Sequence, residues 1–203
     1  MGSMIHSAQP LPKKSSPSAL TVFPHRVREL SMMRLTSLLP ALLLPLLPAV
    51  TVAEDFKVAG MAFSPPGGFV SVKPSSFMRK AQLKVGVDAG EGEVVFFYFG
   101  PRGGGGVEAN VKRWFGQFKE PEAEIKAKTE KGAAGKIPVT FVSAEGTFKS
   151  GPPRGPIVEK PGYALLGAII EGKEGAIFAK FTGPKATVMA FSNAFKGMIT
   201  NAK

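Results

Sequence analysis

The sequence predicts an α+β fold, with one mainly antiparallel sheet and helices covering its faces. Strand-like runs precede and follow a helical segment, so strands and helices do not alternate one by one. Two segments, residues 107–118 and 185–199, carry apolar residues at helical spacing. A pure β-sandwich is the alternative, and the two patterned helices count against it.

The first predicted strands lie between proline-rich breaks. Asp55–Phe63 is predicted as the first strand, because the following SPPGG sequence (64–68) breaks regular structure. Phe69–Val72 is predicted as a short extended segment, which ends before Pro74.

Two longer strands are predicted on either side of a turn at Asp88–Gly92. Ala81–Val87 alternates apolar and polar residues, which indicates a half-buried strand. Glu93–Phe99 (EVVFFYF) is apolar on both faces, which is typical of a strand in the middle of a sheet that is covered on both sides.

A helix is predicted at Val107–Phe118, after the glycine-rich loop Gly100–Gly106. Its apolar positions are Val107, Val111, Trp114, Phe115 and Phe118. Their spacing places them on one side of the helix, so Trp114 is assigned to the core.

The segment after this helix is predicted to form an edge strand, a turn and a long strand. The edge strand is Glu124–Glu130 and the turn is Gly132–Lys136. The long strand is Ile137–Lys149, with a possible bulge at Gly146 because glycine inside a strand often marks one.

The C-terminal part is predicted to contain a hairpin and a helix. Ser150–Gly162 has four prolines in thirteen residues and is predicted to be irregular. Tyr163–Glu171 and Ala176–Thr182 form the hairpin across Gly172–Gly175. The helix Lys185–Ile199 places four apolar side chains on one face, namely Val188, Phe191, Phe195 and Met198.

The N-terminal part has the layout of a secretory signal. Leu35–Val52 is an uncharged apolar run after Arg34, and Thr51-Val52-Ala53 is a suitable cleavage site before Glu54. The sequence therefore predicts a signal peptide at residues 32–53 and a single mature domain at 54–203. The alternative is an uncleaved anchor, because the run just reaches spanning length. Three prolines inside the run favour cleavage.

Residues 1–31 are rich in proline and serine and show no periodicity, which predicts a disordered leader. They are interpreted as a misassigned start upstream of Met32 or Met33. The alternative is the first half of a bipartite plastid signal, which would direct the protein to a thylakoid lumen. The favoured location is periplasmic or secreted.

The composition of residues 54–203 restricts their chemistry. This part has no cysteine, and both histidines, His6 and His25, lie in the leader. The usual metal ligands, the thiol nucleophile and the side chain that titrates near neutrality are therefore missing. We expect no cofactor, no metal and no enzymatic activity.

The mature domain is basic, with a net charge of +7 from 21 Lys and Arg against 14 Asp and Glu. A basic protein often binds nucleic acid, but export argues against such a partner. The expected partner is an acidic protein or an anionic component of the envelope, with no stable membrane span after cleavage.

Three sequence stretches carry a resemblance to known proteins. The last hairpin and helix, FAKFTGPKATVMAFSNAFKGMI, together with the earlier helix, resemble the PsbP-like superfamily over residues 55–200. SSFMRKAQ and GGVEANVKRWFGQF resemble a group of uncharacterised bacterial secreted proteins. The resemblance implies a PsbP-like α+β sandwich that binds a partner without catalysis. It implies no active-site residues.

The glycine-rich loop is the sharpest candidate for a binding site. Flexible glycines before a helix can direct backbone N–H groups at an anion, and a nearby arginine would assist. A polar stripe on the helix lies next to the loop and would cooperate with it. The candidate ligand-binding residues are Arg102, Gly103, Gly104, Gly105, Gly106, Asn110, Arg113 and Gln117. The alternatives are a mobile connector and a solvated helix face.

The sequence thus predicts an exported, non-catalytic binding domain of unknown partner. The second hypothesis is a small anion- or ligand-binding protein that uses the glycine-rich loop and the adjacent helix. A hydrolase is the third, since glycosidases need no histidine. The paired carboxylates for it would come from Glu120, Glu122 and Glu124, which are interpreted as a solvated edge.

Overall fold

The computed structural model describes residues 53–151 and 155–203. The predicted leader therefore lies outside the described residues, apart from Ala53. The strands are β1 (Phe56–Val58), β2 (Met61–Phe63), β3 (Val70–Ser71), β4 (Arg79–Val87), β5 (Gly90–Tyr98), β6 (Lys128–Ala134), β7 (Ile137–Ser150), β8 (Val158–Gly172) and β9 (Gly175–Pro184). The helices are α1 (Val107–Phe115), α2 (Lys185–Ala190) and α3 (Ser192–Thr200).

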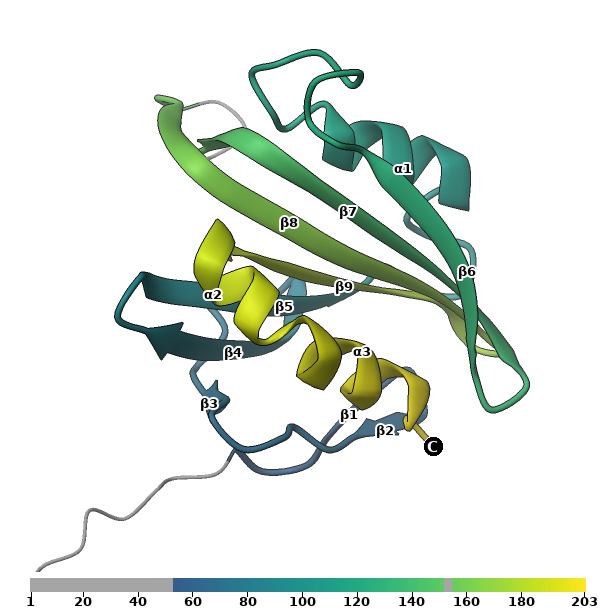
Figure 1. Ribbon diagram of the computed structural model, residues 1–203. Helices are drawn as coiled ribbons and strands as arrows, with labels where there is room; N and C mark the ends of the chain where they lie inside the picture. Colours follow the sequence, from purple (N-terminus) through teal and green to yellow (C-terminus); the bar gives the residue numbers. More distant parts are fainter. Residues whose placement is uncertain (1–52, 152–154) are drawn as a thin grey trace, which may run out of the picture. The chain divides into compact units, whose positions relative to one another are not determined.

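The centre of this part of the chain is a seven-stranded sheet in the order β3-β4-β5-β9-β8-β7-β6 (Figure 1). Every neighbouring pair in it is antiparallel. The predicted α+β class with a mainly antiparallel sheet is confirmed. The predicted hairpin is also confirmed, since β8 and β9 turn back between Gly172 and Gly175.

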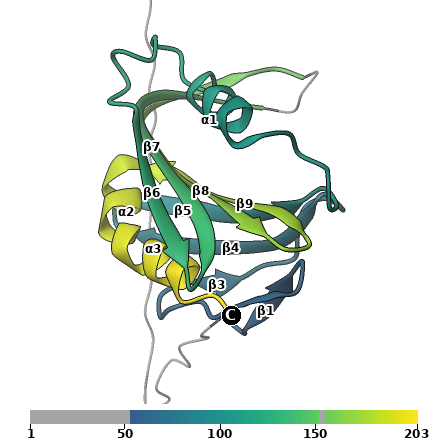
Figure 2. The same cartoon turned by 90° about the vertical axis from the view of Figure 1, so that its right-hand side faces the viewer.

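Helices cover the two faces of the sheet separately, with α1 on one side and α2 and α3 on the other (Figure 2). Beneath α1, Trp114, Phe115 and Phe118 pack on residues of β7, β8 and β9. Trp114 is 6% exposed, so its assignment to the core is confirmed.

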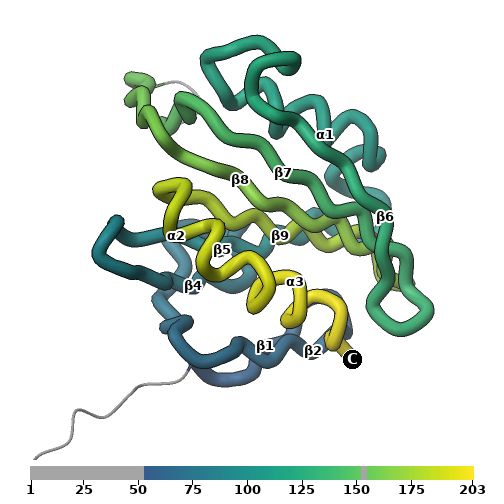
Figure 3. The backbone as a smooth tube through the Cα atoms, in the orientation of Figure 1, coloured from purple at the N-terminus to yellow at the C-terminus, as the bar shows by residue number. Residues whose placement is uncertain are grey.

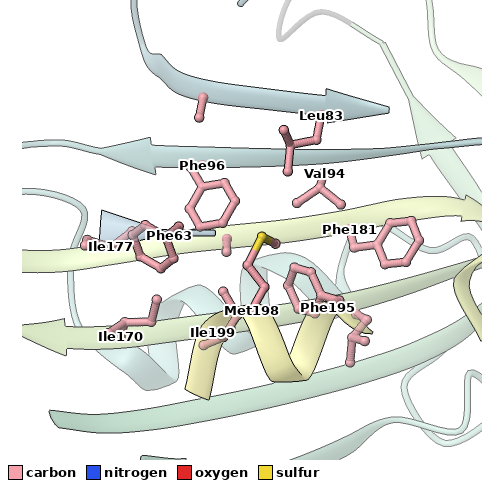
Figure 4. Close-up of a cluster of buried hydrophobic side chains, with 14 of the residues drawn as sticks. Phe63, Leu83, Val94, Phe96, Ile170, Ile177, Phe181, Phe195, Met198 and Ile199 are labelled. Carbon is pink, nitrogen blue, oxygen red and sulfur yellow. The ribbon is translucent and has the colours of Figure 1, made fainter. Parts of the chain in front are cut away.

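The other face carries the larger apolar cluster, which α2, α3 and the N-terminal strands close. Figure 4 shows Phe195, Met198 and Ile199 of α3 directed at side chains from the sheet, among them Phe96 and Phe181. Alternation along each strand supplies one side chain to each cluster in turn, which is how a single sheet serves two cores.

The N-terminal segment differs from the prediction, because Asp55–Phe63 is not one strand. It forms the hairpin β1–β2, which pairs Val58 with Met61. The turn uses Ala59 at φ 45° and Gly60 at φ 75°, the left-handed conformation that tight hairpins require. The chain end lies beside this hairpin (Figure 3), and Ala62 and Lys203 exchange two backbone hydrogen bonds.

The predicted edge strand is displaced along the chain. Residues 124–127 are not part of the strand. The strand β6 begins at Lys128 and extends into the predicted turn, where it ends at Ala134. The reason is that Ile125 is fully buried beneath α1 and is held there by the Glu145 N–H, which donates to its carbonyl.

The start of β8 was predicted to be irregular, and this prediction is wrong for residues 158–162. Val158 pairs with Ser150, so the strand begins before Tyr163. Pro161 has no N–H to donate, and it lies where the register with β7 shifts, between Gly146 and Phe148. The irregularity predicted at Gly146 is therefore present, but the extra residue lies on β8, where the three steps from 160 to 163 oppose the two steps from 146 to 148. Residues 152–154 lie outside the described residues.

The predicted C-terminal helix is two helices, since the segment bends at Phe191 between α2 and α3. The Phe191 ring packs edge-on against Phe69 at 5.6 Å between centroids. The bend lets α2 lie over β8 and β9 while α3 reaches β6, so the two helices follow the twisted sheet. The helix α1 also ends earlier than predicted, at Phe115.

Candidate functional site

The glycine-rich loop is held to α1 by side chains of the predicted polar stripe. The Asn110 amide nitrogen donates to the carbonyls of Gly104 at 2.7 Å and Gly106 at 2.8 Å. Arg113 donates to the Gly104 carbonyl at 3.3 Å and to Asn110 Oδ1 at 2.7 Å. Positive φ angles at Gly104 (87°) and Gly105 (79°) turn the loop, a conformation that favours glycine.

The structure corrects one part of the sequence interpretation, because Asn110 is not on a solvated face. It is 2% exposed, and its amide nitrogen ties the carbonyls of Gly104 and Gly106 to the first turn of α1. The Asn110 and Arg113 donors face backbone carbonyls here. Anion binding by the loop therefore stays a prediction, and it would need these donors to turn away.

Two of the other predicted residues, Arg102 and Gln117, lie outside α1 and outside this hydrogen-bonded group. Arg102 is exposed in the loop. Gln117 follows α1, and its side-chain oxygen accepts a hydrogen bond from Lys180 Nζ at 3.2 Å. The structure thus brings together Gly104, Gly106, Asn110 and Arg113, and it places Gln117 at a different cluster on the sheet.

We expect Asn110→Ala to destabilise the protein by about 1–3 kcal/mol, because two backbone carbonyls lose a buried donor. Urea denaturation followed by circular dichroism measures the change. Asn193→Ala is the matched control, since Asn193 is exposed and its loss should have almost no effect. Equal midpoints for both variants would show that Asn110 does not hold the loop.

The cluster that contains Gln117 lies on the α1 side of the sheet, over β4, β5 and β9. Arg79 Nη1 lies 3.0 Å from Glu93 Oε1. Gln82 donates to the same oxygen at 2.6 Å. Lys180 lies in the next strand, because β9 pairs with β5 and sets Lys180 opposite Val95. We call these five residues, Arg79, Gln82, Glu93, Gln117 and Lys180, the sheet cluster.

Lys180 is the most perturbed group in the sheet cluster. Burial and, to a smaller extent, the nearby Arg79 charge lower its pKa to about 8, against the opposing effect of Glu93. Its Nζ also lies 5.7 Å from the centre of the Phe148 ring. A lysine in such surroundings exists in both protonation states near neutral pH.

An apolar patch adjoins the sheet cluster at one end of β4 and β5. Phe77 is 88% exposed and Met78 44%, directly before Arg79. Arg79 pairs with Phe97 across the strands, and its guanidinium lies 6.0 Å from that ring. Phe97 stacks in turn on Phe99, which is 38% exposed. Apolar surface and positive charge therefore meet at this end of the sheet.

A hollow lies on the opposite side of the sheet from the sheet cluster, between α2, α3 and β6 to β8. It is a cavity of about 200 Å³, with Phe141, Leu166 and Met189 in its lining. Lys128 and Lys196 both bond the Glu130 carboxylate at its rim, and they lower the pKa of Glu130 to about 2. Both lysines are held by this one carboxylate at 2.6 and 2.7 Å, so their ammonium groups are already engaged at the rim.

The three carboxylates that the hydrolase hypothesis would use do not form a site. Glu120 accepts the Thr147 backbone N–H with both carboxylate oxygens, while Glu122 and Glu124 are exposed. In residues 53–151 and 155–203, no three His, Cys, Asp or Glu side chains lie together as a metal site would need. Nor does this part of the chain contain a helix that is long and apolar enough to cross a membrane.

Comparison with known proteins finds likeness in structure alone. No protein-family model matches the chain, and no curated protein matches it. The structure is similar to the solution structure of cyanobacterial PsbP (CyanoP) from Synechocystis sp. PCC 6803, with a TM-score of 0.46 and 9% identity. The similarity covers 74% of this chain and 91% of that chain. A relation to bacterial secreted proteins stays a prediction.

Sequence reasoning missed Lys180 and Glu93 as members of a site. A signal was present for Lys180, since it is the one charged residue in the otherwise largely apolar strand β9. A charge at such a position is costly to bury unless it has a partner. The partners of Lys180 were not visible, because β9 pairs with the distant strand β5, and no local pattern reveals that pairing.

Proposed function

We propose that residues 54–203 are an exported, non-catalytic binding module whose partner is an acidic protein. The partner docks on the patch made by Phe77, Met78, Arg79, Lys80 and Phe99, which we call the docking patch. The observation that carries the proposal is Phe77, a phenylalanine left 88% exposed and separated from the cations Arg79 and Lys80 only by Met78.

Exposed aromatic and arginine side chains are the residues that most often dominate protein interfaces. Here Phe77, Met78 and Phe99 supply apolar area at one end of the sheet. Single exposed apolar residues are ordinary, but several of them at adjoining strand ends mark an interaction surface.

Charge complementarity indicates an acidic partner. Arg79 and Lys80 follow the apolar residues, and the mature domain as a whole is basic at +7. A partner with acidic residues around an apolar centre would match this surface, and its association would be accelerated by the opposite charges. A lipid surface would match the charge as well, but it would bind basic surface elsewhere on the domain too.

The proposal is tested by capture of partners from the protein's own envelope fraction, followed by identification and purification of what is captured. The affinity of the purified partner is then measured for wild type, Phe77→Ser and Lys80→Glu. We expect each change to weaken binding by about tenfold or more, as truncation of an interface anchor does.

Two matched controls lie away from the docking patch. Met189→Ser removes another exposed apolar side chain, 61% exposed on α2, and Lys136→Glu reverses another exposed charge. Both should bind as wild type does. The proposal fails if Phe77→Ser binds as tightly as these controls. It also fails if the domain binds vesicles of phosphatidylglycerol equally well before and after the Phe77 change.

A further inference from the structure

The sheet cluster holds more positive than negative charge in a partly buried place. Two cations, Arg79 and Lys180, face one carboxylate, that of Glu93. Glu93 Oε1 already accepts the Gln82 amide at 2.6 Å. Lys84 of β4 lies opposite Glu93 but forms its ion pair with Glu91, at 2.7 Å.

The donors of the two cations are not fully used. Arg79 Nη1 is buried and, within the described residues, makes no hydrogen bond, although it lies 3.0 Å from Glu93. Lys180 Nζ donates to the neutral Gln117 oxygen at a long 3.2 Å. Arg79 Nη1 thus has an ion-pair partner but no well-formed hydrogen bond, and Lys180 Nζ has only a neutral acceptor, so a further charged acceptor would stabilise both cations.

We infer that Arg79 and Lys180 form a binding site for a carboxylate that the partner supplies. The inference rests on the proposed function for the source of the carboxylate, and the sheet cluster adjoins the docking patch through Arg79. A carboxylate is the ligand that suits this pair, because it is planar, matches the guanidinium fork and leaves an oxygen for the ammonium.

The groups that surround Lys180 decide how binding depends on pH. Arg79 of β4 repels its charge and Glu93 of β5 attracts it, while Gln117 after α1 and Phe148 of β7 are neutral. A second carboxylate beside Lys180 raises its pKa above the free value of about 8. Binding therefore takes up a proton, and affinity is highest below the free pKa and falls as the pH rises through it.

Calorimetric titration of the full chain with a short poly-glutamate peptide tests the inference, with acetate as a second probe. At pH 8, in two buffers with different ionisation enthalpies, we expect wild type to take up about half a proton per site. Lys180→Met should lower the affinity roughly tenfold, the effect of losing one charge-assisted hydrogen bond, and it should remove the proton uptake.

Lys180→Arg is the decisive variant, because arginine keeps the charge but does not titrate. It should bind the peptide and take up no proton. Lys136→Met is the matched control for net charge, since Lys136 is exposed in the β6–β7 turn, and it should behave as wild type. Arg79→Gln should weaken binding as Lys180→Met does.

Two results would overturn the inference. The first is equal peptide affinity in Lys180→Met and Lys136→Met, and the second is no proton uptake by wild type at pH 8. Failure of the proposed function has a different signature, in which Phe77→Ser leaves partner binding unchanged while poly-glutamate still binds with proton uptake. Conversely, partner binding that needs Phe77 but not Lys180 would support the docking patch and contradict the carboxylate site.

Discussion

Trp114→Ala should destabilise the protein by about 3–5 kcal/mol, the usual cost of emptying a large buried aromatic site. Trp114 is 6% exposed and lies edge-on to Phe178, with 6.5 Å between the ring centroids. It also covers Gly167 of β8, where a β-carbon would come within 2.6 Å of Trp114 Cε3. The indole thus fills the space that joins α1 to the sheet.

Circular dichroism in urea measures this change, because the variant has no tryptophan left to report by fluorescence. Gly167→Ala provides the control for direct contact. It should destabilise wild type by about 1–3 kcal/mol through overpacking. The effect should be smaller in the Trp114→Ala background, where Val142 Cγ2, at 2.8 Å, still crowds the added β-carbon but the indole does not. Additive effects of the two changes would show that Trp114 does not pack on Gly167.

Phe195→Ala should have an effect of similar size on the opposite face, again about 3–5 kcal/mol. Phe195 is fully buried, and its ring lies 5.8 Å from that of Phe181 of β9. Its removal leaves a cavity between α3 and the sheet. Because a domain has about 5–15 kcal/mol of stability in total, this single change removes a large part of it.

Phe77→Ala is the matched control for Phe195→Ala, because it makes the same chemical change at a side chain that is 88% exposed. Its free energy of unfolding, measured in urea, should stay within about 0.5 kcal/mol of wild type. If Phe195→Ala proved as mild as this control, α3 would not be packed on the sheet as the structure has it.

Local patterns in the sequence predicted the elements whose signals are repeated along the chain. Alternation identified β4, the two apolar faces of Glu93–Phe99 identified the interior strand β5, and helical spacing identified α1 with Trp114 inside. These succeeded because each residue's face follows from its position in a strand or helix. The boundaries failed where a turn or bend depends on a distant contact, as at Phe191.

The candidate site shows the same division more sharply. The sequence identified Asn110 and Arg113 as a polar pair beside a glycine-rich loop, and the structure brings them to that loop. Polarity alone does not tell whether the partner of a side chain is water, an anion or a backbone carbonyl. Only the folded chain shows that Asn110 is buried and bound to carbonyls.

By itself, the sequence determined the α+β class, the helix α1 with Trp114 on its buried face, the hairpin of β8 and β9, and the basic charge of residues 54–203. The tertiary structure decided the strand order, in which β9 lies between β5 and β8 and sets Lys180 near Arg79 and Glu93. The physical reason is that periodicity fixes which face a side chain takes, whereas strand neighbours are fixed by pairing between distant segments. The sheet cluster exists only through that pairing.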